Sequence, residues 1–348
     1  MTGTPGLALT RPEADSRQTP PGRPERLSTA QPTVHVPVRQ VGRHAARALA
    51  DEREWRVFAV FRRSFYCQSA TGALVLVGPE RLGAGPLHVL WADGSDAFVA
   101  AGVEEGLRVG VARDGVRDDT AKPLTLGLRD AREWVPAAPP DWPPSSLRRS
   151  LAWLAESPER PPAEGLGRLL APVASGTLDR VGAADSSLRR LARPALGALT
   201  SWLHAALGRE SRAADPPDAI GDLVGLGPGL TPSGDDVLAG ALLALHGFAR
   251  VDVAQRLGVW LHSRVDGRTG LVSRAHLACA ARGEGAAVLH DALAALASGN
   301  AIALAAATSA VGTLGHCSGW DGLVGIAATA TAWLGARVDH GGRSTPCR

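Results

Sequence analysis

The chain has 348 residues, of which 45% are hydrophobic and 20% charged, with a formal net charge of +3. These totals predict a soluble globular protein of two domains. The short, dispersed arginine clusters argue against nucleic-acid binding, and no apolar run approaches the ~20 residues that cross a bilayer. Four distant cysteines without a CxxC pair, and first residues that do not resemble a signal peptide, favour a reduced, cytoplasmic protein and disfavour a zinc ribbon.

Residues 1–33 are rich in Pro, Arg, Thr and Ser and show no hydrophobic periodicity. This composition predicts a disordered tail. Short apolar runs separated by glycine-rich turns follow and predict a β-rich domain over 34–135, either barrel-like or sandwich-like. The expected strands are 34–38, 55–61, 73–77, 86–91, 108–112 and 124–128, with a short helix over 42–50.

The proline-rich segment 136–144 predicts a semi-rigid linker. Helical periodicity then dominates and predicts an α-helical domain over 145–340, before a tail at 341–348. The expected helices are 146–156, 163–170, 186–207, 219–224, 233–250, 253–264, one starting at Thr269, 286–297, 301–311 and 319–338. The predicted fold class is therefore α+β, with the β-rich domain first.

The stretch from Gly225 to Gly240 reads as a glycine-rich loop that turns into a buried helix. Gly225, Gly227 and Gly229 allow positive φ angles in the loop. Ser233 followed three residues later by Asp236 has the form of a capping box, which predicts Ser233 as the N-cap of the helix. The loop lacks the Gly-Lys-Ser/Thr ending of a phosphate-binding P-loop.

A second, shorter copy of this motif lies 85 residues further along the chain, because 318 − 233 = 85. The copies match at Ser, Gly, Asp, Leu and Gly, so that Ser318, Asp321 and Gly325 repeat Ser233, Asp236 and Gly240. We expect two pseudo-symmetric helix N-termini that converge on one pocket. The alternative is two unrelated core helices, each with its own serine cap and packing glycine.

Free backbone N–H groups at a helix N-terminus attract phosphate or carboxylate groups. Asp235 and Asp236 would repel a bare anion, so they suit a site that also holds a cation or a substrate with N–H donors. Asp235, Asp236, Asp321 and His316 could hold Mg²⁺ together with a phosphate. His316 is an acid–base candidate or a surface hydrogen-bonder, while Thr269 and Ser273 are expected to cap or solvate a helix rather than line the pocket.

The run Gly225–Asp236, together with Gly315–Asp321, resembles a bacterial family long classed as of unknown function, one member of which is the AllH subunit of oxamate carbamoyltransferase. The resemblance covers the helical domain best. It implies the conversion of oxalurate and phosphate into oxamate and carbamoyl phosphate in purine (allantoin) nitrogen metabolism. It also implies two other subunits as partners, one of them similar to an acyl-CoA synthetase. The chain departs from the family pattern at Cys317, where serine is usual.

We therefore expect a carbamoyltransferase subunit that binds a small anionic substrate, without nucleic acid or membrane partners and without a resident metal or cofactor, Mg²⁺ entering only with phosphate. The alternative is a non-catalytic ligand-binding or scaffolding subunit. The expected catalytic residues are Asp235, His316 and Asp321. The expected substrate-binding residues are Gly227, Gly229, Thr231, Ser233, Gly234, Asp236, Ser318 and Gly319.

Overall fold

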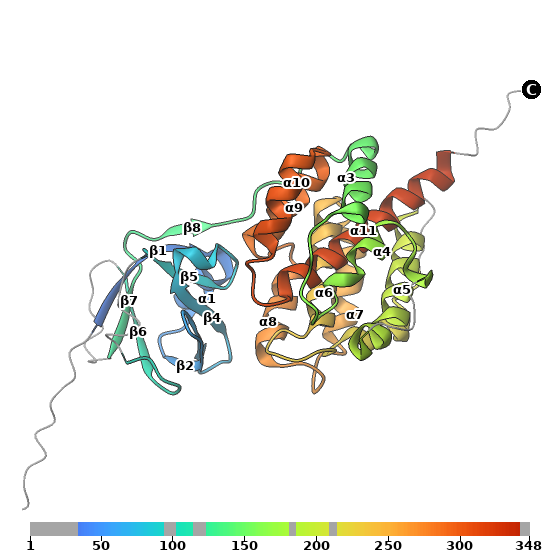
Figure 1. The fold of residues 1–348 in the computed structure, drawn as a ribbon. Coiled ribbons are helices and arrows are strands. Elements are labelled where there is room, and N and C mark those ends of the chain that lie inside the picture. Colours follow the sequence, from blue (N-terminus) through green and yellow to red (C-terminus); the bar gives the residue numbers. More distant parts are fainter. Residues whose placement is uncertain (1–33, 94–101, 114–122, 181–185, 209–213, 342–348) are drawn as a thin grey trace, which may run out of the picture. The chain divides into compact units, whose positions relative to one another are not determined.

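The computed structural model describes residues 34–93, 102–113, 123–180, 186–208 and 214–341. The expected tail at 1–33, and all but the first residue of the one at 341–348, lie outside these residues. Within them, residues 34–134 form a closed β-barrel and residues 144–338 are helical (Figure 1). The predicted α+β class, with the β-rich part first, is confirmed.

The barrel closes because β1 pairs with β7 on one side and with β5 on the other. Seven strands follow each other in the order β5, β4, β3, β2, β6, β7, β1, and β8 adds to β1 outside the ring. In β2 the buried Trp55 and Val57 alternate with the exposed Arg56, as expected for a strand with one face in the barrel core. The elements are β1 (Val34–Gly42), α1 (Arg43–Asp51), β2 (Trp55–Val60), β3 (Phe65–Ser69), β4 (Leu74–Pro79), β5 (His88–Trp91), β6 (Arg108–Ala112), β7 (Leu124–Gly127) and β8 (Arg132–Trp134).

The predicted strands are present, but β3 and β8 were not predicted. β3 carries Tyr66, Cys67 and Gln68 among buried neighbours and lacks apolar–polar alternation, since all but Gln68 of its residues are buried. β8 has only three residues. A strand buried on both faces, or one this short, gives no period-2 signal.

The helical region contains α3 (Pro144–Glu156), α4 (Leu170–Ala174), α5 (Ser187–Leu207), α6 (Ser233–Gly247), α7 (Val251–His262), α8 (Leu271–Ala280), α9 (Ala287–Ser298), α10 (Ala301–Val311) and α11 (Ser318–Gly341). Two predicted helices are wrong in type. Residues 163–169 form a loop with a 3₁₀ turn before α4, and 219–223 belong to a 3₁₀ helix, Asp218–Leu223. Among the described residues, no helix combines the length and the apolar character needed to cross a membrane.

α11 runs through the middle of the helices, with α6 beside it (Figure 1), and contacts α3, α4, α5, α6 and α9. Residues 319–336 of α11 are therefore buried or half-buried on all sides, and even Thr329 is fully buried. The largest helix–helix interface of this region joins α11 to α6. These two helices carry the two copies of the motif at their N-termini.

Two glycines permit the close approach of α6 and α11. A Cβ atom on Gly240 would lie 1.9 Å from the carbonyl oxygen of Gly322, and one on Gly325 would lie 1.9 Å from that of Val237. Since 237 + 85 = 322 and 240 + 85 = 325, the two contacts are the same contact repeated with the helices exchanged. The two copies are thus related by an approximate two-fold axis between the helices.

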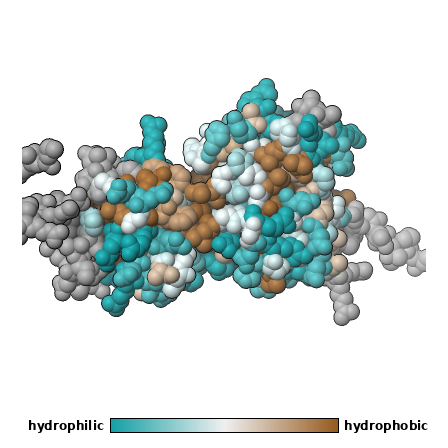
Figure 2. Space-filling view, turned by 90° about the horizontal axis from the view of Figure 1, so that it is seen from below, coloured by the Kyte–Doolittle hydropathy of each residue, from teal (hydrophilic) through white to brown (hydrophobic). Residues whose placement is uncertain are grey.

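Large hydrophobic side chains also remain on the surface. Ile302 is 82% exposed and Val259 is 74% exposed, and Figure 2 shows apolar patches among polar ones on one face of the molecule. Exposed hydrophobic residues of this kind are common in soluble proteins and do not by themselves mark an interface.

Candidate functional site

The two motif helices begin one residue earlier than their serines would require as caps. Pro232 is the N-cap of α6, Ser233 is its first residue, and no side chain caps the helix. Ser318 is likewise the first residue of α11. The predicted capping box is therefore wrong: a serine inside the first turn can direct its hydroxyl away from its own helix.

The hydroxyls point across to the other helix instead. The Ser233 hydroxyl lies within hydrogen-bonding reach of the Asp321 carboxyl, and the Ser318 hydroxyl lies in the same way beside Asp236. The 85-residue offset turns the first contact into the second. Thr231 joins this cluster, with its Oγ1 3.0 Å from Oγ of Ser318. The structure thus brings the two helix starts together, as the repeat predicts.

Burial dominates the electrostatics of the two carboxyl groups. Burial raises the pKa of Asp321 to about 6, although hydrogen bonds from the Ser233 hydroxyl and from the N–H groups of Leu166 and Gly167 act to lower it. Burial also raises the pKa of Asp236 well above its usual value, and the charges of Asp321 and Asp235 add to that effect. No partner within the described residues satisfies Oδ2 of either aspartate. Two buried, unsatisfied carboxyl oxygens are costly for folding and mark a candidate functional site.

Asp235 has a different environment. It is 1% exposed, and its Oδ1 accepts a 2.8 Å hydrogen bond from the N–H of Gly225. Its Oδ2 accepts from the hydroxyls of Thr269 and Ser273, the latter at 2.6 Å. Thr269 and Ser273 therefore do not simply cap or solvate α8, which begins at Leu271 after Gly270. Asp235 ties the glycine-rich loop to the start of α8, and both of its oxygens are engaged.

Most of the backbone N–H groups expected to bind an anion have partners. The N–H of Gly234 donates to Leu226, and those of Asp235 and Asp236 donate to Pro232. In the second copy, Gly319 donates to Leu314 and Asp321 donates to Cys317. These N–H groups close the turns before the helices and the first turn of each helix. A ligand at this site meets carboxyl and hydroxyl groups before it meets free amides.

The glycine-rich loop shapes the approach to the site. Gly227 has φ +119°, and a Cβ on it would lie 3.3 Å from the Ser233 hydroxyl oxygen. In the second copy, Gly315 has φ +61°, and a Cβ there would be 3.3 Å from the Ser318 hydroxyl. Gly229 also has a positive φ but lies at the exposed tip of the loop, with open space around it. Of the two loop glycines predicted to bind substrate, Gly227 lies against the cluster and Gly229 does not.

A third segment, which sequence reasoning missed, completes the wall of the site. The N–H of Leu166 donates to Oδ1 of Asp321 at 2.6 Å. A Cβ on Gly165 (φ +72°) would lie 2.9 Å from both oxygens of that carboxyl. Buried Arg189 holds the segment by donating to the carbonyls of Ala163 and Gly165. The pair Gly165–Leu–Gly167, which repeats the Gly225–Leu–Gly227 of the main loop, is the signal that could have drawn attention to it.

His316 and Cys317 lie at the rim. His316 is exposed, with Nε2 3.3 Å from a carboxylate oxygen of Glu164, so the structure does not place it among the buried carboxyls. The Cys317 thiol is partly buried. Burial, followed by the charges of Asp321, Glu164 and Asp236, raises its pKa to about 11. This thiol stays protonated at neutral pH and is not an activated nucleophile.

The barrel also reaches toward this region. The hydroxyl of Tyr66 in β3 lies 3.0 Å from Nε2 of His276 in α8, and Tyr66 packs with Leu74 and Val272. Burial, and secondarily the charge of Asp236, raises the pKa of the Tyr66 phenol. Burial lowers the pKa of His276 to about 4. Both groups are therefore neutral at pH 7.

Fold and site together define an α+β protein in which two duplicated helix N-termini enclose a carboxyl–hydroxyl cluster. Residues 223–330 match the family model described as oxamate carbamoyltransferase subunit AllH. The match confirms the resemblance predicted from the loop motif, for this part of the helical region. No curated protein and no solved structure matches the chain.

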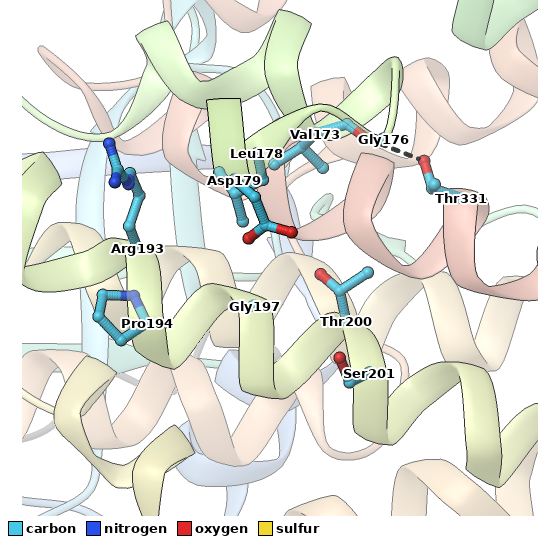
Figure 3. Close-up of a pocket in the computed structure, with 10 residues that line it drawn as sticks. All are labelled: Val173, Gly176, Leu178, Asp179, Arg193, Pro194, Gly197, Thr200, Ser201 and Thr331. Carbon is cyan, nitrogen blue, oxygen red and sulfur yellow. Dashed lines mark hydrogen bonds between the residues drawn. The ribbon is translucent and has the colours of Figure 1, made fainter. Parts of the chain in front are cut away.

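A separate hollow of about 470 Å³ lies between α5, the segment after α4 and α11 (Figure 3). Asp179 and Arg193 supply its charged groups, and Thr331 on its wall donates to the carbonyl of Val173 at 3.2 Å. None of its lining residues belongs to the segment that matches the family. We therefore place the candidate site at the two helix N-termini, where the unsatisfied carboxyls and the family match coincide.

Proposed function

We propose that this chain takes part in carbamoyl transfer between carbamoyl phosphate and oxamate, as a subunit of a larger enzyme in purine (allantoin) nitrogen metabolism. One observation carries the proposal. The crossed pairs Ser233–Asp321 and Ser318–Asp236 lie within the segment that matches the AllH family. The matching family is described as one subunit of an enzyme, which supports an assembly with partner subunits. The other subunits that the resemblance implies would be those partners.

The reaction requires a group that accepts one proton. Toward oxalurate, the amide nitrogen of oxamate bonds to the carbamoyl carbon, the bond from that carbon to the phosphate oxygen breaks, and the nitrogen gives up a proton. A carboxyl group with a pKa near 6 is suited to take up and release a proton at neutral pH. Asp321 is therefore the proposed proton acceptor, with Ser233 orienting it.

The anionic groups of the substrates need positive charge, which the buried cluster itself lacks. His316 and Arg168 lie near Glu164 at the rim. A backbone hydrogen bond is the largest cause of the lowered pKa of that carboxyl, and His316 and Arg168 contribute to it. We assign the phosphate or carboxylate end of the substrate to this rim and the amide end to the cluster. Mg²⁺ usually keeps several waters and binds one or two carboxylates with substrate phosphates, so we expect it only in company with phosphate.

The test is carbamoyl transfer by the complex assembled from this chain and its partner subunits. We expect Asp321→Asn to lower kcat by at least about a hundredfold, the usual contribution of general acid–base catalysis. Asp291→Asn, on the exposed face of α9, is the matched control and should leave the rate unchanged. Equal rates for the two variants would reject Asp321 as the proton acceptor.

A second candidate is an accessory subunit that binds a metabolite without catalysing transfer. The engaged N–H groups at both helix starts and the protonated Cys317 thiol favour it, because neither oxyanion stabilisation nor a nucleophile is then supplied by these groups. It predicts that Asp321→Asn changes substrate affinity but leaves kcat of the assembled enzyme intact.

A further inference from the structure

The orphaned oxygens of Asp236 and Asp321 suggest what kind of group the site takes. Each aspartate has one oxygen without a partner in the described residues, and both oxygens are buried. Asp321 itself has no exposed surface, while Oδ1 of Asp321 already accepts from Leu166. Since buried carboxyl oxygens rarely remain without partners, a bound group that hydrogen-bonds to both is the natural complement.

The two carboxyls differ in charge near neutral pH. Burial, and after it the charge of the neighbouring Asp321, raises the pKa of Asp236 well above its usual value, and burial raises that of Asp321 to about 6. Because two neighbouring buried carboxyls disfavour double ionisation, the pair retains one proton, which we assign to Asp236. The pair then offers one O–H donor and one carboxylate acceptor. A primary carboxamide presents the matching set, because its carbonyl oxygen accepts and its NH₂ group donates.

A metal ion fits the same oxygens less well. Among the residues that the structure describes, no three His, Cys, Asp or Glu side chains are grouped to hold one. Both oxygens of Asp235 are engaged by Gly225, Thr269 and Ser273. His316 lies at the exposed rim with Glu164. Two carboxyls remain, of which one is protonated.

We propose that Asp236 and Asp321 together bind a primary carboxamide group, with the Asp236 O–H donating to its carbonyl and Asp321 accepting from its N–H. The proposal rests on the proposed function, in which oxamate brings such a group. Thr231, Asp236 and Ser318 keep part of their surface exposed while Asp321 is enclosed. The ligand therefore enters past the Thr231 and Ser318 hydroxyls and places its N–H deepest.

The test compares binding of oxamate and oxalate, which share a carboxylate and differ by one amide, to the full chain alone and within the assembled complex. Titration calorimetry at pH 7 should give oxamate at least about tenfold tighter binding than oxalate, because oxalate leaves Asp321 facing another acceptor. Equal binding of the two ligands, tighter binding of oxalate, or no binding of oxamate in either form would overturn the proposal.

Two asparagine variants should behave differently, which separates this proposal from an anion or cation site. Asp236→Asn keeps a donor for the ligand carbonyl and should weaken oxamate by less than about fivefold. In Asp321→Asn the Leu166 N–H holds the remaining carbonyl oxygen, so an NH₂ group faces the ligand N–H and affinity should fall by more than about tenfold. Asp291→Asn is the control.

Other outcomes contradict the proposal in identifiable ways. A cation site predicts that Mg²⁺ alone binds and that both variants abolish its binding. A phosphate or carboxylate site predicts that both variants strengthen oxalate or inorganic phosphate. The proposed function can fail separately. If the assembled complex transfers no carbamoyl group, while the preference for oxamate and the difference between the two variants persist, the carboxamide site is supported and the enzymatic role is rejected.

Discussion

The hydroxyls of Thr231 and Ser318 lie 3.0 Å apart although 87 positions separate them in the sequence. Thr231 precedes α6 and Ser318 begins α11, so this contact joins the two copies of the motif. It follows from the close packing of the helices behind it, which the reciprocal contacts of Gly240 and Gly325 allow. The geometry of the candidate site therefore depends on helix packing two turns away.

Gly240→Ala tests that dependence. The new methyl group would lie 1.9 Å from the Gly322 carbonyl oxygen, so α6 and α11 must separate, and we expect a loss of about 3 kcal/mol or more in unfolding free energy. Gly197→Ala in α5 is the matched control: nothing lies within 4 Å of its Cβ position, and it should stabilise the protein by about 0.5–1 kcal/mol. Chemical denaturation measures both. Similar stabilities for the two variants would contradict the close packing of α6 on α11.

Asp321→Asn is expected to stabilise the folded protein above pH 6. The folded pKa of about 6 exceeds the ordinary value of 3.8, so the folded state binds more protons between these pH values. Unfolding free energy therefore falls as pH rises from about 4 to about 6, by up to about 3 kcal/mol, and Asn removes this loss. Denaturation of both proteins at pH 4 and pH 7.5 measures the difference. A variant that is less stable at pH 7.5 would show that the charged carboxyl is satisfied in the folded protein.

Asp235→Ala should have the opposite effect. It leaves the Gly225 N–H and the hydroxyls of Thr269 and Ser273 without their acceptor, at a cost of about 3 kcal/mol or more for hydrogen bonds to a charged group. Thermal unfolding should show a clear fall in Tm. Asp222→Ala, at an exposed position just before the loop, is its control. An unchanged Tm for Asp235→Ala would mean that Asp235 does not hold the loop to α8.

Cys317 should react slowly with alkylating reagents. A thiol pKa of about 11 leaves few thiolates at pH 8, so we expect labelling roughly a hundredfold slower than for free cysteine. Peptide-resolved mass spectrometry separates Cys317 from the other cysteines. Because Asp321 contributes to the shift, Asp321→Asn should speed up the labelling. Rapid labelling of the unaltered chain would contradict the partial burial of this thiol and the carboxyls around it.

Local patterns in the sequence were sufficient for the fold class, for most strands and for the longer helices. Alternation of buried and exposed residues, as in Trp55–Val60, is imposed by the barrel wall and is visible in the residues themselves. The match between Ser233–Gly240 and Ser318–Gly325 likewise predicted two equivalent helix starts. Both signals can be read from the residues of single elements, because each reflects which face of one element meets the core.

The direction of each side chain was decided by tertiary packing. Ser233 has the sequence context of a cap, yet it serves the carboxyl of another helix, and Asp235 and its neighbour Asp236 have opposite roles. Asp235 accepts hydrogen bonds from three donors in other segments, whereas Asp236 keeps one oxygen without a partner in the described residues. The contacts of segment 165–167 with Asp321 and of Tyr66 with His276 were not predicted for the same reason. Hydrogen bonds and burial between distant segments depend on where the helices cross, and no local period records that.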